Sequence, residues 1–95
     1  MNNKLKELNV EFLFSAILKL ETMEECYAFF EDLCTIPELK ALSQRIQVAK
    51  MLSDRKVYSE IVEKTGASTA TISCVNRSLA YGSDGYKIVF ERLEK

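Results

Sequence analysis

The chain has 95 residues, a formal net charge of −1 and apolar side chains at 47% of its positions. A chain of this length forms one small domain that buries roughly 60–65% of its unfolded surface, so the apolar surplus needs a partner, most simply a second copy of the chain. Histidine, the commonest general base and neutral metal ligand, is absent, and charges interrupt the apolar runs too often for a membrane span. Composition therefore disfavours an enzyme and a membrane protein.

The three cysteines, Cys26, Cys34 and Cys74, show no CxxC spacing, and no signal peptide precedes them. This usage fits a reducing cytoplasm better than a disulfide framework or a zinc site. No glycine-rich phosphate loop or serine nucleophile elbow is present either. We therefore expect no catalytic residue, no metal and no cofactor.

The first predicted helix runs from about Lys4 to Leu20 and is apolar on two sides. Such a helix must be covered from two directions, and in a short chain the second cover is expected from a partner subunit. A second helix follows to about Leu33, opened by a capping box of Thr22 and Glu25. Its apolar side chains are predicted to supply much of the aromatic core: Tyr27, Phe29, Phe30 and Leu33.

The third predicted helix begins with a second capping pattern, Thr35 and Glu38, and has Pro37 in its first turn, where the missing amide costs nothing. It ends near Asp54. Its apolar residues recur at helical spacing: Leu39, Leu42, Ile46, Ala49 and Leu52.

Residues 58–79 predict two short helices with a bend at Gly66, a residue that adopts the left-handed conformation without steric cost. Ser68 is placed to cap the second helix. Ile61, Ile72 and Val75 are predicted to face inward. The outward positions of the second helix are small or polar, with one cation, and suit a DNA major groove: Thr69, Ala70, Ser73, Cys74 and Arg77. The pattern is that of a helix-turn-helix.

Val62 departs from this pattern, because the position that faces the second helix usually holds alanine or glycine. A slight opening of the pair, or compensation elsewhere, would be needed. Helical hairpins with a glycine bend also occur in proteins that do not bind DNA. After the pair, residues 82–85 predict a turn and Tyr86 to Glu94 a final amphipathic helix, so the fold class is all-α with about six helices.

Positive charge is concentrated around the helix pair. Residues 1–39 hold three cations and eight anions, whereas residues 40–82 hold seven cations (Lys40, Arg45, Lys50, Arg55, Lys56, Lys64, Arg77) and three anions (Asp54, Glu60, Glu63). Binding to a polyanion depends on local potential rather than on net charge. Ordinary solvated helix faces are the alternative explanation.

Four segments carry a resemblance to a known family: ECYAFFEDLCTI (25–36), SQRIQVAKML (43–52), TGASTATIS (65–73) and AYGSDGY (80–86). The chain resembles the Trp repressor superfamily, and within it the bacterial Trp repressor-related proteins of the YerC/YecD type. The resemblance implies an intertwined homodimer whose subunits each offer a helix-turn-helix to DNA. It implies a single helical domain, 1–95, with a dimerisation core (1–54), a helix-turn-helix (58–81) and a C-terminal helix (84–95).

The resemblance also implies a small-molecule effector site. The Trp repressor holds tryptophan between two arginines, with a threonine and a serine nearby, and Thr35, Arg45 and Ser78 match the threonine, the first arginine and the serine. Cys74 stands in place of the second arginine. A cysteine offers no planar cation to a carboxylate, which argues against tryptophan as the effector. A surface ion pair is the alternative role for Arg45.

These observations together predict a cytoplasmic, bacterial transcription regulator, a repressor, that binds double-stranded DNA as a homodimer. Thr69, Ala70 and Ser73 are the expected base contacts, and Ser68, Lys56 and Arg77 the expected phosphate contacts. The alternative is a dimeric helical adaptor that binds another protein and not DNA.

Overall fold

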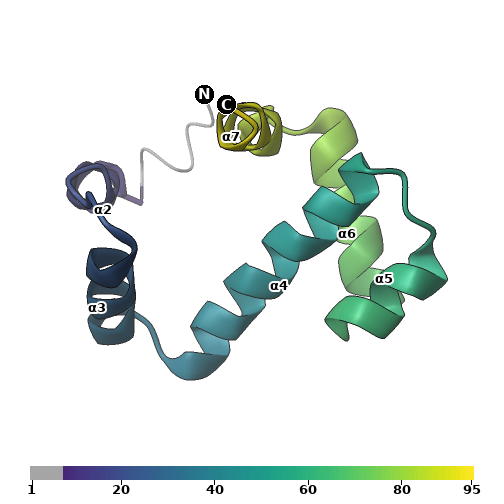
Figure 1. Cartoon of the computed structure of the whole chain (residues 1–95), viewed down its shortest axis with the longest axis horizontal. Coiled ribbons are helices and arrows are strands. Elements are labelled where there is room, and N and C mark those ends of the chain that lie inside the picture. The colour runs from purple at the N-terminus through teal and green to yellow at the C-terminus, as the bar shows by residue number, and fades with distance from the viewer. Residues whose placement is uncertain (1–7) are drawn as a thin grey trace. The chain divides into compact units, whose positions relative to one another are not determined.

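The computed structural model describes residues 8–95, and these contain six helices and no strand (Figure 1). The predicted all-helical fold class is confirmed. The chain divides into two compact units, one that ends at Ile36 and one from Pro37 to Lys95, and each is described by itself. The helices are α2 (Glu11–Ile17), α3 (Met23–Leu33), α4 (Ile36–Ser53), α5 (Tyr58–Thr65), α6 (Thr69–Tyr81) and α7 (Gly85–Leu93).

The first predicted helix is shorter than expected. Its residues 4–7 lie outside the described part of the chain, and residues 8–10 form a turn in which Asn9 has φ +57°. Asparagine tolerates this left-handed conformation better than most residues, and the conformation interrupts a right-handed helix. At the other end, the amides of Lys19 and Leu20 bond to carbonyls three residues back, so α2 closes at Ile17 in a tight final turn.

The capping box of α3 is confirmed. The Glu25 amide donates to the Thr22 hydroxyl at 3.1 Å, and the Glu25 carboxylate accepts from the amide of Glu21 at 2.9 Å. The return bond therefore reaches the residue before the cap rather than the cap itself. Both bonds join residues within four positions of each other, which is why the sequence alone could predict this helix start.

The first unit does not supply the aromatic core that the sequence predicts. None of the residues of α2 and α3 is buried. Phe29 and Phe30 contact each other edge to face and are half-buried, whereas Tyr27 and Leu33 are exposed, as is Phe12 at 84%. These side chains remain available to whatever covers the unit.

The core of the described chain lies in the second unit. Ile61, Ile72 and Val75 are fully buried, as their inward placement predicts. Each buried side chain of this kind contributes roughly 1.5–3 kcal/mol. From α4 the buried residues are Val48 and Ala49, whereas Leu39, Leu42 and Ile46 of the predicted apolar face are exposed. The complete core set is Val48, Ala49, Ile61, Ala67, Ile72, Val75 and Phe90.

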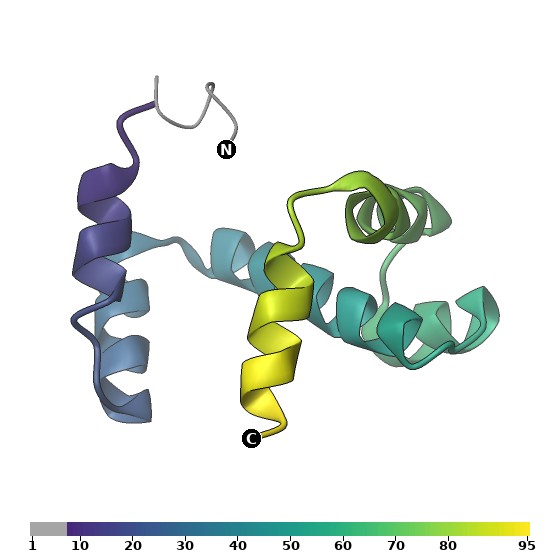
Figure 2. The same ribbon diagram turned by 90° about the horizontal axis from the view of Figure 1, so that it is seen from above.

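In Figures 1 and 2, α5 and α6 lie beside the C-terminal half of α4. The helix pair is thus packed on a third helix through one shared core. The last helix, α7, begins at Gly85, one residue before its predicted start, and contributes Phe90 to that core. Within residues 8–95, no helix combines the length and the apolar character that a membrane crossing requires.

Candidate nucleic-acid interface

The bend between α5 and α6 has the predicted backbone. Gly66 ends α5 with φ +74° and ψ +5°, and its amide donates to the Val62 carbonyl at 2.9 Å. Glycine takes this left-handed conformation without a Cβ penalty. The prediction that Gly66 terminates the first helix of the pair is confirmed, and the chain turns here toward α6.

Ser68 caps α6, also as predicted. Its hydroxyl accepts from the Thr71 amide at 3.1 Å and donates to the Thr71 hydroxyl at 3.1 Å. A serine cap satisfies one of the orphan amides of the first turn. Thr69 and Ala70 are the first two residues of the helix and are exposed, and the first amides of a helix have no partner within it.

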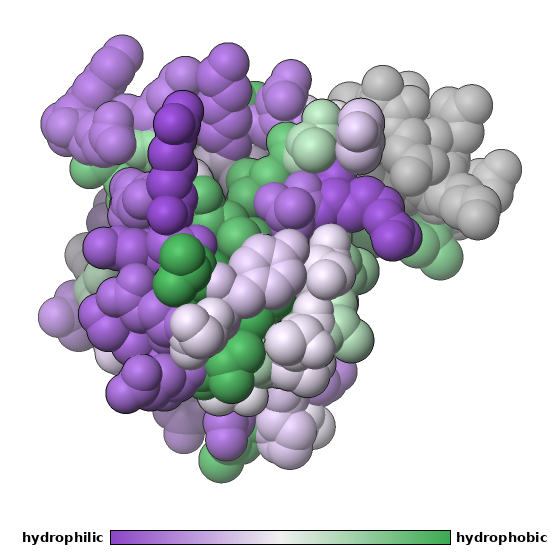
Figure 3. Space-filling model, turned by 90° about the vertical axis from the view of Figure 1, so that its right-hand side faces the viewer, coloured by the Kyte–Doolittle hydropathy of each residue, from purple (hydrophilic) through white to green (hydrophobic). Residues whose placement is uncertain are grey.

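The outward face of α6 is exposed along its length. Thr69, Ser73 and Arg77 follow one another at four-residue spacing, and all three are exposed, as are Ala70 and Cys74. Ile72 and Val75 point the other way into the core. Figure 3 views the side on which α5 and α6 lie in Figure 1, and weakly polar side chains gather on it beside hydrophobic ones. This face could lie in a groove without first displacing a bulky side chain.

Val62 is not part of the buried core between the two helices. Its side chain is 37% exposed, while the neighbouring Ile61 is fully buried. The close packing of α5 against α6 is made by Ile61, together with Ile72 and Val75. Val62 is therefore outside the buried core of the pair, which forms despite the departure from the usual alanine or glycine.

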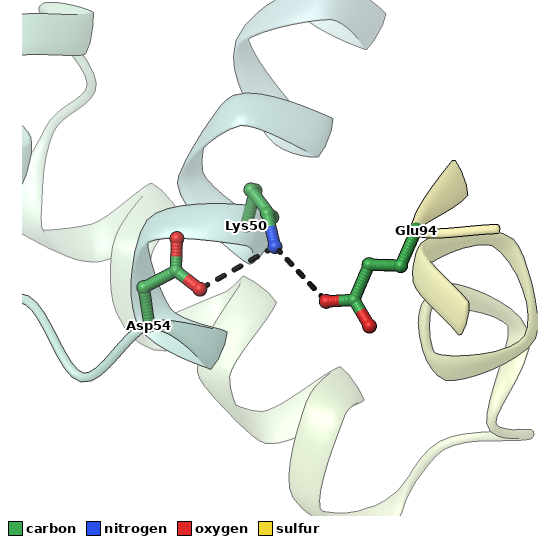
Figure 4. Close-up of polar contacts among 3 residues, drawn as sticks. All are labelled: Lys50, Asp54 and Glu94. Carbon is green, nitrogen blue, oxygen red and sulfur yellow. Dashed lines mark hydrogen bonds and ion pairs between the residues drawn. The ribbon is translucent and has the colours of Figure 1, made fainter. Parts of the chain in front are cut away.

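Some cations of residues 40–82 are paired with carboxylates, and others form no ion pair with residues 8–95. Lys50 Nζ lies 3.4 Å from Asp54 Oδ1 and 3.9 Å from Glu94 Oε1 (Figure 4), and it lies 5.6 Å from the centre of the Phe90 ring. Lys64 pairs with Glu60 at 3.4 Å. In the part of the chain that the structure describes, the remaining cations of this segment form no ion pair: Lys40, Arg45, Arg55, Lys56 and Arg77.

Lys56 and Arg77, the two predicted phosphate contacts with a positive charge, belong to that unpaired group and are exposed. Lys56 lies in the connection between α4 and α5, and Arg77 in the second half of α6. An unpaired surface cation loses little on meeting a phosphate, because it gives up no existing partner.

The residues of the predicted effector site are exposed as well. Arg45 lies in α4, and Ser78 lies in α6, where its hydroxyl donates to the Cys74 carbonyl at 3.3 Å. Thr35 precedes α4 and belongs to the other unit. Within residues 8–95, Arg45 forms no ion pair.

Sequence reasoning missed Thr65, which organises the bend. Its hydroxyl donates to the Ile61 carbonyl at 2.7 Å and accepts from the Ala67 amide at 3.1 Å. The hydroxyl thus ties the last turn of α5 to the residue after the glycine. A threonine directly before a helix-ending glycine was the available signal, since threonine hydroxyls bond readily to nearby backbone groups.

These features define a helix-turn-helix domain: two helices are joined by a bend at glycine, the second helix has an exposed face, and both pack against a third helix. The chain belongs to the Trp repressor family: the model of that family, described as Trp repressor protein, matches residues 8–94. This is a family of helical regulators rather than of enzymes. The family and the fold inferred from the sequence are therefore confirmed.

Three relatives illustrate the similarity. The uncharacterised protein YerC of Bacillus subtilis (strain 168) is 48% identical over 93 residues, which cover 98% of this chain and 89% of YerC. The crystal structure of a TrpR-like protein from Eubacterium eligens has a TM-score of 0.92 and 64% identity, and covers 98% of this chain and 96% of that one. A candidate Trp repressor from Staphylococcus aureus has a TM-score of 0.91 and 51% identity, with 97% and 92% covered.

Proposed function

We propose that the protein is a sequence-specific transcription regulator, a repressor of the bacterial cytoplasm. It would act as a homodimer and bind DNA through α5 and α6. The observation that carries this proposal is the exposed face of α6, where Thr69, Ala70 and Ser73 lie opposite the fully buried Ile72 and Val75. Membership of a regulator family agrees with it. No chemistry is required, because a repressor blocks transcription by occupying its site.

The roles of the individual residues follow from their positions. Thr69 and Ser73 would donate or accept hydrogen bonds at base edges, and Ala70 would contact a thymine methyl. Ser68, whose hydroxyl bonds to Thr71, would hold phosphate at the start of α6 together with the amides of the first turn. Lys56, between α4 and α5, and Arg77, in the second half of α6, would add charge at other phosphates.

A homodimer is supported by the first unit. None of the residues in its two described helices is buried, and large apolar side chains such as Phe12, Leu18 and Tyr27 are exposed. Exposed apolar surface of this kind is typical of an obligate interface. A two-fold dimer would place two α6 helices on half-sites about one helical turn of DNA apart.

The proposed function predicts a steep salt response. If the dimer neutralises about six phosphates, its affinity should fall roughly a thousandfold between 50 and 200 mM salt. Genome-wide mapping of bound DNA would supply the duplex, and fluorescence anisotropy would measure the affinity at each salt concentration. A flat response would contradict the mechanism.

An adaptor that binds another protein is the second candidate. It is favoured by the exposed acidic side chains of α3, which include Glu24, Glu31 and Asp32. The double variant Thr69→Ala, Arg77→Ala separates the two functions. If the variant loses DNA binding but remains a dimer by sedimentation, the regulator is supported. If the wild type does not bind DNA and the variant binds a protein partner as well as the wild type does, the adaptor is supported.

The effector contacts that the sequence resemblance suggests are Arg45 and Ser78 in the second unit and Thr35 in the first. Because a ligand that binds the folded state raises its melting temperature, a thermal-shift screen of amino acids tests this part of the proposal. Tryptophan is not expected to give the largest shift, since Cys74 supplies no second guanidinium.

A further inference from the structure

Gln44 connects α4 to the bend of the helix pair. Its Nε2 donates to the Thr65 carbonyl at 3.0 Å, across 21 residues of sequence, and the bond is partly buried. A Cβ built on Gly66 would lie 3.9 Å from the same nitrogen, so the amide lies directly against the bend. Gln44 is one helical turn before the fully buried Val48, and therefore projects from the face of α4 on which the pair packs.

The carbonyl that Gln44 binds has no partner in its own helix. Thr65 is the last residue of α5, and the final four carbonyls of a helix lack an intrahelical donor. The Thr65 hydroxyl fixes the bend from within, through Ile61 and Ala67. Gln44 holds the same residue from α4, a helix that is not part of the α5–α6 pair.

We propose that Gln44 is a positioning residue for DNA recognition, because its bond to Thr65 sets the direction in which α6 leaves the bend. The buried Ile72 and Val75 hold α6 against the core along its first half, and the hydrophobic effect that drives their burial is non-directional. A hydrogen bond weakens steeply when its angle changes, so it restrains orientation as well as distance.

The residues that this restraint would serve lie immediately beyond the bend. Thr69 and Ala70 follow Thr65 by four and five positions, and in a helix-turn-helix the N-terminal residues of the second helix contact the bases. A small rotation of α6 at Thr65 would move every residue of this helix, Arg77 included. Hydrogen bonds to base edges weaken steeply with angle, whereas the attraction of an exposed cation to a phosphate falls only gradually with distance, so base contacts would suffer first. This inference rests on the proposed DNA-binding function and adds a residue to it.

The test compares Gln44→Met, which keeps the length of the side chain and removes the donor, with Gln44→Glu, which keeps its shape and is acceptor-only when ionised. Gln47→Met, on an exposed position of the same helix, is the matched control. Fluorescence anisotropy would measure the affinity of each protein for a duplex identified by genomic mapping and for a scrambled duplex of the same composition. Circular dichroism would confirm that each variant is folded at the assay temperature.

Both Gln44 variants should lower the ratio of specific to non-specific affinity by about fivefold, the effect of one net hydrogen bond. For Gln44→Met, the affinity for the scrambled duplex and the salt slope should match the wild type, since no charge has changed. Gln44→Glu adds a negative charge that weakens binding to both duplexes alike, so this variant is judged by the ratio alone. Gln47→Met should leave the ratio unchanged. A general loss of stability would weaken binding to both duplexes alike and would not change the ratio.

Amide hydrogen exchange tests the structural half of the inference without DNA. In Gln44→Met the amides of Gly66 and Ala67 should exchange faster than in the wild type, while those of Ile72 and Val75 keep their protection. Unchanged exchange at the bend, or an unchanged affinity ratio in a folded variant, would overturn the role of Gln44 alone. A wild-type protein with no preference among duplexes would overturn the proposed function and this inference together.

Discussion

Arg55 ends α4 in a conformation that suits glycine better than arginine. Its φ is +62°, and two backbone bonds close the helix around it: the Lys56 amide donates to the Met51 carbonyl and the Arg55 amide to the Leu52 carbonyl, both at 3.0 Å. This is the Schellman arrangement, in which the left-handed residue is usually glycine. The Arg55 side chain is exposed and forms no ion pair with any residue from 8 to 95.

Replacing Arg55 by glycine should therefore stabilise the protein. The left-handed conformation costs a residue with a Cβ about 1–2 kcal/mol, and glycine is free of this cost. Glycine also lowers the free energy of unfolding by about 0.5–1 kcal/mol, because it gives the unfolded chain more conformational freedom. The net gain is about 0.5–1 kcal/mol, which corresponds to a rise in melting temperature of about 2–8 °C for a domain of this size.

The melting temperature is measured by circular dichroism in the absence of DNA. All variants are compared at one protomer concentration, because self-association makes the melting temperature depend on concentration. Gly66→Ala is the control of opposite sign. Gly66 has φ +74°, and an added Cβ would meet Gln44 Nε2 only at 3.9 Å, an ordinary contact, so backbone strain of about 1 kcal/mol should lower stability. A melting temperature that falls in Arg55→Gly would refute this account of the α4 terminus.

Urea unfolding should separate three further contributions. Ser68→Ala removes the cap that accepts from the Thr71 amide and should cost about 1 kcal/mol; an unchanged midpoint would mean that water replaces the cap. Thr65→Val removes a hydroxyl with two hydrogen bonds at the bend and should cost about 1–2 kcal/mol, with an unchanged m-value if the fold is kept. Glu94→Gln breaks the 3.9 Å ion pair between Glu94, which is 72% exposed, and Lys50, which is 45% exposed. Because both side chains are solvated, the free energy of unfolding should change by less than about 0.5 kcal/mol. A larger loss would show that the pair holds α7 in place.

The parts of the structure that the sequence predicted correctly depend on short-range interactions. Thr22 and Ser68 each cap a helix by accepting from an amide three residues ahead, and Gly66 ends a helix through its own backbone freedom. The inward Ile72 and Val75 are three residues apart on one short helix, so its polar and apolar faces are distinct. The exposure of Thr69, Ser73 and the other proposed DNA contacts follows from the same periodicity.

The tertiary structure alone decided which apolar face of α4 is buried. This helix carries apolar residues on several sides, and the apolar face that its spacing predicted included Leu42 and Ile46 but not Val48. The helix pair packs on the side of Val48, which leaves Leu42 and Ile46 exposed. The sequence of one helix cannot specify which of several apolar sides a distant segment will cover.

The Gln44–Thr65 bond and the left-handed Arg55 were beyond sequence reasoning for related reasons. The bond joins residues 21 positions apart, and no local pattern marks a glutamine that meets a carbonyl of another helix. Arg55 adopts a conformation that its own side chain disfavours, because the path from α4 into α5 requires it. Local chemistry determined where most helices begin and end, whereas long-range packing determined which sides of them meet.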